Sequence, residues 1–134
     1  MCHGLWRTPA SHPLEQRLKT IYEAVTGLLA EHAPDALALE ESYVGADARI
    51  ALSVGQARGV VLLAGALADV ACAEYAPARV KQSVCGYGRA DKGQVQRMIS
   101  MILGLAEPMS DHASDALAVA VCHAMAPPRL KAAG

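Results

Sequence analysis

The chain has 134 residues, is 53% hydrophobic and carries a formal net charge of -1. This composition excludes a disordered chain, and the length predicts a single compact domain with a buried core. The low net charge excludes nucleic-acid binding through the overall electrostatic field, so such a partner would need a local basic patch. The longest uncharged apolar run, between Arg58 and Asp69, is too short for the roughly 20 residues of a membrane span.

The four cysteines, at positions 2, 72, 85 and 122, are widely spaced and form no C-x-x-C pair. No secretory signal is apparent at the N-terminus, so we expect free thiols and a reducing cytoplasm. No internal repeat or low-complexity segment is evident either, which also fits one globular domain.

Residues 1–13 are expected to form a remnant strand around positions 5–7 and a linker bracketed by Pro9 and Pro13. From Leu14, apolar residues recur every three or four positions, which predicts an amphipathic helix that runs to about Glu31. Its apolar stripe comprises Leu18, Ile21, Val25, Leu28 and Leu29.

Four consecutive apolar residues, 36–39, lie between the helix-stopping Pro34 and two carboxylates, Glu40 and Glu41. The run predicts a strand buried on both faces, as in a sheet covered by helices. Because ligands gather beyond the carboxyl ends of strands in open α/β sheets, Glu40 or Glu41 stands where catalytic groups are expected. Tyr43, in the following loop, either stacks on a base or covers the core.

Residues 48–70 are apolar almost all round, which predicts a helix buried on most sides. Gly55 and Gly59 remove side chains from one stripe of this helix, so that the sheet or a second copy of the same helix can approach closely. Residues 71–75 predict a second strand, and Pro77 is well placed to begin another helix. Strands that alternate with helices imply parallel pairing and an α/β layer.

The local basic patch lies between residues 79 and 97, a segment with five basic residues and one acidic residue. The cations are Arg79, Lys81, Arg89, Lys92 and Arg97. Such a patch can hold a phosphate backbone, and the loop 86–88, Gly-Tyr-Gly, would add backbone N–H groups and a stacking face. The same pattern is also typical of an ordinary solvated surface with a flexible turn.

Two more helices are predicted. Asp91 and Gln94 have the spacing of a capping box, and Gly104 is placed to end the helix that they begin. The last helix starts at about Ser110 with an acidic cap and continues through small and apolar residues. Residues 126–134 are expected to form a flexible basic tail.

His112 and Asp115 are three residues apart and therefore share a face of the last helix, in its first turns. Acids in this position usually cap the helix and are kept ionised by its dipole. The alternative is a metal site, because His112 and Asp115 together with Glu40 could hold Mg²⁺ or Mn²⁺.

Five stretches carry the most distinctive residues of the chain. They are LEESY at 39–43, GQARGV at 55–60, EYAP and VKQ between 74 and 82, GYGRADK and QVQRM between 86 and 98, and DHASDALA at 111–118. Together they resemble the RuvC family of Holliday-junction resolvases. The similarity extends over about residues 7–123 and keeps the family's spacing throughout.

The resemblance implies an α/β fold of the ribonuclease H-like type, in which a mixed sheet is flanked by helices. It also implies a crossover junction endodeoxyribonuclease that nicks two strands of a four-way DNA junction symmetrically, in recombination and repair. Glu40, His112 and Asp115 would then be the catalytic and metal-binding residues, with Mg²⁺ or Mn²⁺ and two ions in each site.

The same resemblance implies DNA contacts and protein partners. Lys81 and Lys92 match basic residues near the scissile phosphate, Arg79 and Arg89 would extend the DNA surface, and Tyr43 matches an aromatic residue that opens the junction. The helix with Gly55 and Gly59 would form a homodimer. A RuvA–RuvB branch-migration complex would be a further partner.

The chain departs from the family pattern at its start. The family begins with a strand whose aspartate bridges the metal ions, whereas this chain has no aspartate before Asp35. We expect the N-terminal strands to be missing, which would expose an apolar edge of the strand 36–39 and slow the reaction at least about a thousandfold. Three hypotheses follow: an active resolvase whose sequence starts too late, a truncated and catalytically impaired chain that still binds junctions, or a remnant without a DNA role.

Overall fold

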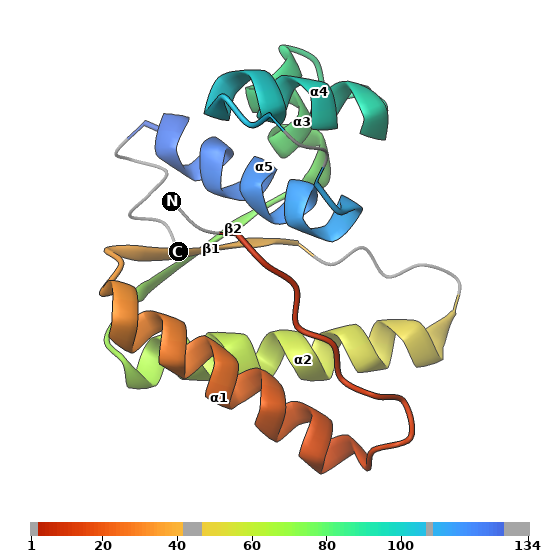
Figure 1. The fold of residues 1–134 in the computed structure, drawn as a ribbon, viewed down its shortest axis with the longest axis vertical. Helices are drawn as coiled ribbons and strands as arrows, with labels where there is room; N and C mark the ends of the chain where they lie inside the picture. Colours follow the sequence, from red (N-terminus) through yellow and green to blue (C-terminus); the bar gives the residue numbers. More distant parts are fainter. Residues whose placement is uncertain (1–2, 42–46, 107–108, 128–134) are drawn as a thin grey trace. The chain divides into compact units, whose positions relative to one another are not determined.

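The computed structural model of the protein describes residues 3–41, 47–106 and 109–127. Helices and strands alternate in this part of the chain as the sequence predicts (Figure 1). The elements are α1 (Leu14–His32), β1 (Ala36–Glu40), α2 (Ala48–Leu67), β2 (Ala71–Tyr75), α3 (Pro77–Cys85), α4 (Lys92–Leu103) and α5 (Asp111–Met125).

β1 and β2 pair in a two-stranded parallel sheet, which confirms the predicted pairing (Figure 1). The Glu41 N–H donates a hydrogen bond to the carbonyl of Tyr75 at 2.9 Å, so the pairing reaches the carboxyl ends of both strands. The prediction that β1 is buried on both faces is wrong, because its apolar residues are only half-buried. Within the described ranges β1 has one neighbouring strand, which leaves part of its surface uncovered.

The prediction of a strand end around residues 5–7 is also wrong, since these residues have no regular structure. A strand needs a hydrogen-bonded neighbour, and β1 and β2 pair only with each other in the residues that the structure describes.

The chain divides into two compact units, and a single domain therefore remains a prediction. Unit 1 contains residues up to 5, 38–41 and 73 onward, and unit 2 contains residues 6–37 and 42–72. The sheet contributes residues to both units, and each unit has a core of its own.

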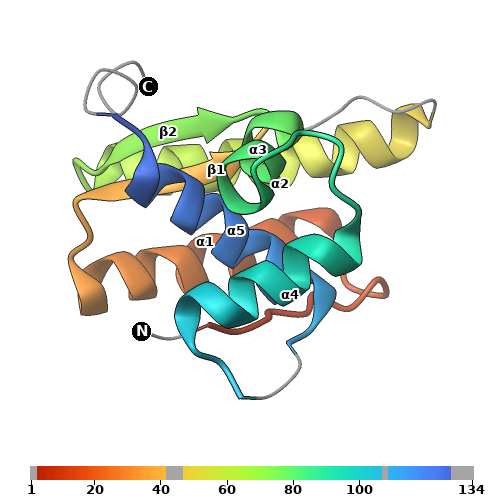
Figure 2. The same ribbon diagram turned by 90° about the horizontal axis from the view of Figure 1, so that it is seen from above.

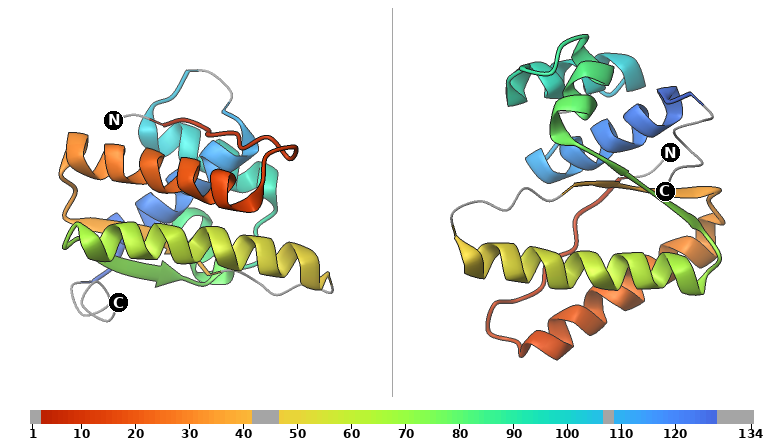
Figure 3. Two further views of the ribbon diagram at one scale, coloured as in Figure 1. Left: turned by 90° about the horizontal axis from the view of Figure 1, so that it is seen from below. Right: turned by 180° about the vertical axis from the view of Figure 1, so that it is seen from behind.

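In unit 2, α1 packs against α2 (Figure 3). Val25 and Leu29 of α1, both in the predicted apolar stripe, form the core with Ala64 of α2. Gly65 lies where a Cβ atom would come within 2.7 Å of the Cys72 sulfur, so glycine is what allows this close approach. The helix predicted from Leu14 is therefore confirmed, but of its predicted stripe Val25 and Leu29 are buried whereas Leu28 is 38% exposed.

α2 is far more exposed than its composition predicts. Only Ala64 and Gly65 are buried along its 20 residues. Its large exposed apolar side chains are Ile50, Leu52, Val54, Leu63 and Leu67. With a mean hydropathy of 1.6, α2 is also long and apolar enough to cross a membrane, although Arg58 interrupts its apolar run. The prediction of burial on most sides is wrong because α1 covers only one stripe of the helix.

In unit 1, α3, α4 and α5 pack together beside the carboxyl ends of the strands (Figure 2). Ile99 of α4 and Cys122 of α5 are completely buried or nearly so, with 0% and 1% of their surface exposed. The fully packed side of α5 includes Leu117, Ala118, Val121 and Cys122. This core fixes the helices that carry the polar residues described below.

The helix ends of unit 1 follow the predicted signals. Pro77 is the first residue of α3, Asp91 and Gln94 form the capping box of α4, and Gly104 ends α4 with a φ of 63°. The predicted acidic cap of α5 is wrong, because the hydroxyl of Ser110 accepts the hydrogen bond of the Ala113 N–H. A serine hydroxyl caps a helix as well as a carboxylate, and this leaves the nearby acids available for other contacts.

Candidate active site

Four charged side chains that are distant in the sequence meet at one pocket of unit 1. Glu40 comes from the end of β1, Lys81 from α3, Lys92 from the first turn of α4 and Asp115 from the second turn of α5. The pocket has a volume of about 180 Å³, and its apolar wall is made by Pro77, Val80, Val95 and Ala118. Two carboxylates and two ammonium groups therefore face a shared space.

The carboxylate of Glu40 is destabilised in this pocket. Partial burial raises the pKa of Glu40 above its ordinary value of 4.5, and the negative charge of Asp115 raises it further. Lys81 and Lys92 act in the opposite direction, but they do not cancel the rise. A like-charge pair that raises a carboxyl pKa marks a place where a bound cation would be stabilised.

Lys92 links the carboxylates of α5 across the rim of the pocket. Its Nζ lies 3.3 Å from Oδ2 of Asp111 and 3.4 Å from Oδ2 of Asp115. The hydrogen bond to Asp111 is the main reason why the pKa of Lys92 is raised. All three side chains are substantially exposed, so water and ions reach the group.

Asp111 and Gln96 are site residues that the sequence did not indicate. Nε2 of Gln96 donates to Oδ1 of Asp111 at 3.0 Å, while Oδ2 of the same carboxylate faces Lys92. The contact joins α4 to α5, and no periodicity within either helix reveals it. Only the acidic first turn of α5 pointed to this region.

His112 is exposed in the first turn of α5 and does not line the pocket. Among the described residues, no group of three or more His, Cys, Asp and Glu side chains is arranged to hold a metal ion. The structure thus brings Glu40 and Asp115 together and leaves His112 aside. Two carboxylates still fit Mg²⁺, which is commonly bound through one or two carboxylates, water and substrate phosphates.

The remaining predicted DNA contacts either do not line the pocket or lie outside the described residues. Arg79 is exposed on α3 and Arg89 is exposed in the loop between α3 and α4, and neither lines the pocket. Tyr87 of this loop is 47% exposed, and Gly86 has a φ of 84°, which glycine adopts without strain. Tyr43 lies outside the part of the chain that is described.

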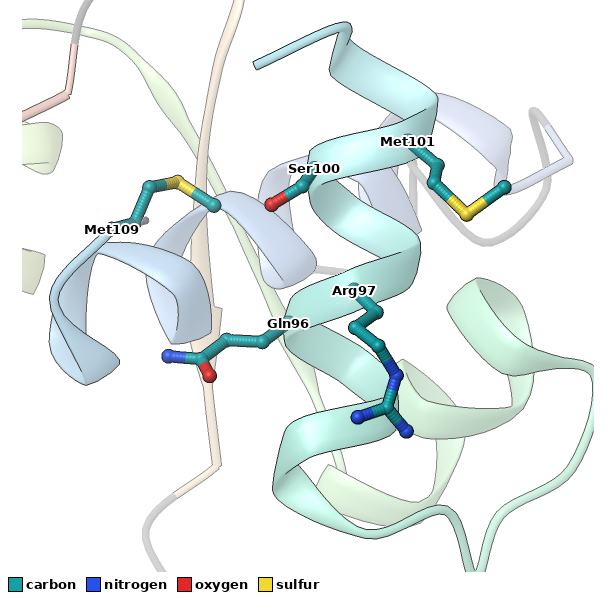
Figure 4. A pocket seen from close by; sticks show the side chains of 5 residues that line it. All are labelled: Gln96, Arg97, Ser100, Met101 and Met109. Atoms are coloured by element: carbon teal, nitrogen blue, oxygen red, sulfur yellow. The ribbon is translucent and has the colours of Figure 1, made fainter. Parts of the chain in front are cut away.

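A second hollow runs along α4 (Figure 4). It has a volume of about 450 Å³ and is lined by Gln96, Arg97, Ser100, Met101 and Met109. Figure 4 shows the Arg97 and Met101 side chains on one side of the helix and Gln96 on the other. Among the described residues no carboxylate lines this hollow, and the smaller pocket with Glu40 and Asp115 is the candidate for chemistry.

Known proteins resemble this chain over most of its length. Residues 1–123 match the family model for crossover junction endodeoxyribonuclease RuvC. The chain is 48% identical over 123 residues to this enzyme from Desulfitobacterium hafniense, a match covering 91% of the chain and 74% of the relative. It is 47% identical over 132 residues to the enzyme from Chloroflexus aggregans, with 98% and 80% covered.

Two solved structures are similar as well. The Thermus thermophilus RuvC structure superposes with a TM-score of 0.82 at 38% identity, covering 89% of this chain and 72% of that one. The same protein in complex with Holliday junction substrate gives a TM-score of 0.84 at 38% identity, with 88% and 72% covered. These neighbours confirm the predicted ribonuclease H-like α/β class. The chain belongs to the RuvC family of crossover junction endodeoxyribonucleases.

Proposed function

We propose that the chain is a structure-specific endonuclease that resolves Holliday junctions by nicking two strands symmetrically, in homologous recombination and DNA repair. The observation that carries the proposal is the convergence of Glu40 and Asp115 on one pocket with Lys81 and Lys92. Carboxylates that share a space with lysines suit a cation held against a phosphodiester. Membership of the family and a solved relative in complex with Holliday junction substrate support the choice of DNA.

Glu40 and Asp115 would hold Mg²⁺, or Mn²⁺ in its place, because both ions prefer carboxylate oxygens. A bound divalent ion would lower the pKa of water and stabilise charge on the phosphate oxygens. The raised pKa of Glu40 supports this assignment, since a cation relieves the repulsion from Asp115. A second ion would need a further carboxylate in addition to these two, or ligands from the substrate.

The two lysines would bind the DNA near the cleaved bond. Lys81 and Lys92 line the same pocket as the carboxylates, so a phosphate held there is reached by both ammonium groups. Arg79 and Arg89 are exposed nearby on α3 and the following loop and would contact the flanking backbone. The stacking role of Tyr43 at the junction centre also belongs to the proposal.

His112 would serve the reaction either as a metal ligand or as a proton carrier. The exposed position of His112 beside the acids of α5 is compatible with proton exchange with solvent. A rotation of the side chain would be needed for metal contact, because His112 does not line the pocket.

Symmetrical nicking requires two active sites, and a homodimer through α2 would supply them. Leu52, Gly55, Gly59 and Leu63 follow one another at helical spacing, and Leu52 and Leu63 are 64% and 53% exposed. A Cβ atom at Gly55 or Gly59 would meet nothing within 4 Å, so this stripe is open to a partner helix.

Location and further partners follow from the proposed role. Cys85 and Cys122 are free thiols, which supports a reducing cytoplasm over a secreted location. A RuvA–RuvB branch-migration complex is the proposed further partner, and membership of the RuvC family is what supports it.

A second candidate is a chain that binds junctions but cuts them poorly. It is favoured by the observation that no group of three or more metal-ligating side chains occurs in the described ranges. Tight placement of a phosphodiester and its attacking water commonly uses several carboxylates. Binding and cleavage must therefore be measured separately.

The test is a nicking assay with a synthetic four-way junction and a linear duplex of the same sequence, with Mg²⁺. We expect paired nicks in the junction only, and a loss of at least about a hundredfold in rate for Glu40→Gln and Asp115→Asn. Glu23→Gln on α1 removes the same charge at a residue that does not line the pocket, and this variant should cut normally. Salt-sensitive junction binding without any nick would favour the second candidate, and no preference for the junction would refute both.

A further inference from the structure

A buried tyrosine joins the two elements that carry the carboxylates of the pocket. Tyr75 is the last residue of β2 and is only 3% exposed. Its hydroxyl lies 2.7 Å from Nδ1 of His123 on α5, and the two rings meet edge to face with centroids 5.7 Å apart. A short hydrogen bond and a ring contact thus fix the end of β2 against α5.

The main chain of Tyr75 fixes the other partner. Its carbonyl accepts a hydrogen bond from the Glu41 N–H at 2.9 Å, directly after Glu40 at the end of β1. Asp115 precedes His123 by eight residues on α5, or about 12 Å along the helix axis. The path from Glu40 to Asp115 runs through Glu41, Tyr75 and His123, so only Glu41 and Tyr75 on it lie outside β1 and α5.

From this geometry we propose that Tyr75 and His123 are positioning residues, which set the separation of the Glu40 and Asp115 carboxylates for divalent-ion binding. The inference rests on the proposed metal-dependent function. A site that holds a small cation through two carboxylates loses affinity when their separation drifts by a fraction of an ångström, because Mg²⁺ requires near-ideal geometry.

The surroundings of the pair suit a lasting contact. Burial, and secondarily the Cys122 thiol, raises the pKa of Tyr75, so its hydroxyl stays protonated around neutral pH. Ser83 of α3 and Cys122 lie 3.2 Å apart, which is a second polar contact of α5 within unit 1. That contact joins α5 to α3 and does not involve β1 or β2, so Ser83 offers a control.

The experiment compares Mn²⁺ binding to the full chain and its variants by calorimetry, together with thermal unfolding. Tyr75→Phe and His123→Leu each remove the hydrogen bond and should raise the Mn²⁺ dissociation constant three- to tenfold. The double variant should be no weaker than either single one, because both break the same contact. His123→Asn keeps a polar atom near the position of Nδ1 and should restore most of the affinity.

Two controls separate positioning from simple loss of stability. Val119→Ala creates a small cavity in the buried side of α5, and Ser83→Ala removes the polar contact between Ser83 and Cys122. Both should lower the unfolding temperature with less than a twofold change in Mn²⁺ affinity. Equal Mn²⁺ affinity in Tyr75→Phe and the original chain, or affinities that merely follow the unfolding temperatures, would overturn the inference.

Amide exchange in the metal-free chain distinguishes a failure of the positioning inference from a failure of the proposed metal-dependent function. If the connection is real, the Glu41 amide exchanges faster with solvent in Tyr75→Phe and His123→Leu than in the original chain. Unchanged Glu41 protection refutes the positioning role. Faster exchange in a chain whose Mn²⁺ binding does not depend on Glu40 keeps the connection and refutes the metal site.

Discussion

Lys92 Nζ lies 3.4 Å from Oδ2 of Asp115, so an ammonium group of α4 and a carboxylate of α5 meet at the rim of the candidate active site. Side-chain exposures of 53% and 44% place the pair in contact with solvent. Exposed ion pairs contribute little to stability. In the proposed function, Lys92 would therefore exchange its carboxylate partners for a DNA phosphate at small cost.

The first prediction concerns Lys92→Ala and Lys81→Ala. Each should leave the unfolding temperature almost unchanged, weaken binding to a four-way junction, and lower the slope of log affinity against log salt by about one, since each removes one phosphate contact. Fluorescence anisotropy between roughly 50 and 200 mM salt measures this slope. Lys19→Ala, at an exposed pair with Glu23 on α1, should keep the slope. A slope unchanged in all three variants would place the DNA elsewhere.

The second prediction concerns the stability of the metal-free chain and its pH dependence. The folded chain raises the pKa of Glu40 above 4.5, mainly by burial and then by repulsion from Asp115. The folded state therefore binds more protons than the unfolded state between pH 4.5 and the folded pKa, and stability falls as pH rises through that window. Glu40→Gln removes this penalty and should raise the unfolding temperature at pH 7 by roughly 1–3 °C.

The same comparison at pH 4 supplies the check. Below the unfolded pKa, Glu40 is largely protonated in both states, so the gain from Glu40→Gln should nearly vanish. Scanning calorimetry without divalent ions measures the unfolding midpoints of the original chain and of Glu40→Gln at both pH values. Glu23→Gln controls for the change in net charge. A lower unfolding temperature for Glu40→Gln at pH 7 would mean that the carboxylates are not in repulsion.

A third prediction uses one substitution at two glycines. Gly86→Ala forces a side chain into a φ of 84° after α3 and should cost about 1 kcal/mol of stability. Gly27→Ala, in the exposed interior of α1 where a Cβ atom meets nothing within 4 Å, should gain roughly 0.5–1 kcal/mol. Urea unfolding measures the change in the free energy of unfolding for both variants. Two gains or two losses of stability would contradict this explanation.

A fourth prediction addresses the exposed face of α2. If a second copy covers the stripe with Gly55, Gly59 and Leu63, then Leu63→Glu buries a charge at the interface and should convert a dimer into a monomer in sedimentation velocity. Met101→Glu adds the same charge at a side chain of α4 that is 75% exposed, and should keep the dimer. A monomer before any substitution, or a dimer in Leu63→Glu, would leave the apolar face for another partner.

Local signals were sufficient to predict most of the fold. Apolar periodicity predicts α1, and capping residues such as Asp91 and Gly104 predict the ends of α4, because these signals act within a few residues. Burial was predicted poorly where it depends on distant partners. The apolar run of α2 looks the same whether α1 covers one stripe or a core surrounds the whole helix.

In the candidate site, too, local signals were informative and contacts between distant residues were not predicted. Position after a strand indicates Glu40 or Glu41, and helix spacing puts Asp115 on one face with His112, where a cap is the usual interpretation. The choice of Glu40 and Asp115 as metal ligands came from the family resemblance. The contacts of Lys92 with Asp111, and of Tyr75 with His123, join elements that are far apart in the sequence. No spacing rule connects such residues, and the three-dimensional arrangement was needed to find them.

Mn²⁺ binding tests the central claim most directly, because it shows whether the carboxylates of Glu40 and Asp115 bind the same metal ion. We predict a Glu40-dependent binding event in calorimetry that weakens at least tenfold in Glu40→Gln and in Asp115→Asn and is retained in Glu23→Gln. Equal Mn²⁺ affinity in all four proteins would contradict the claim that these two carboxylates form a metal site.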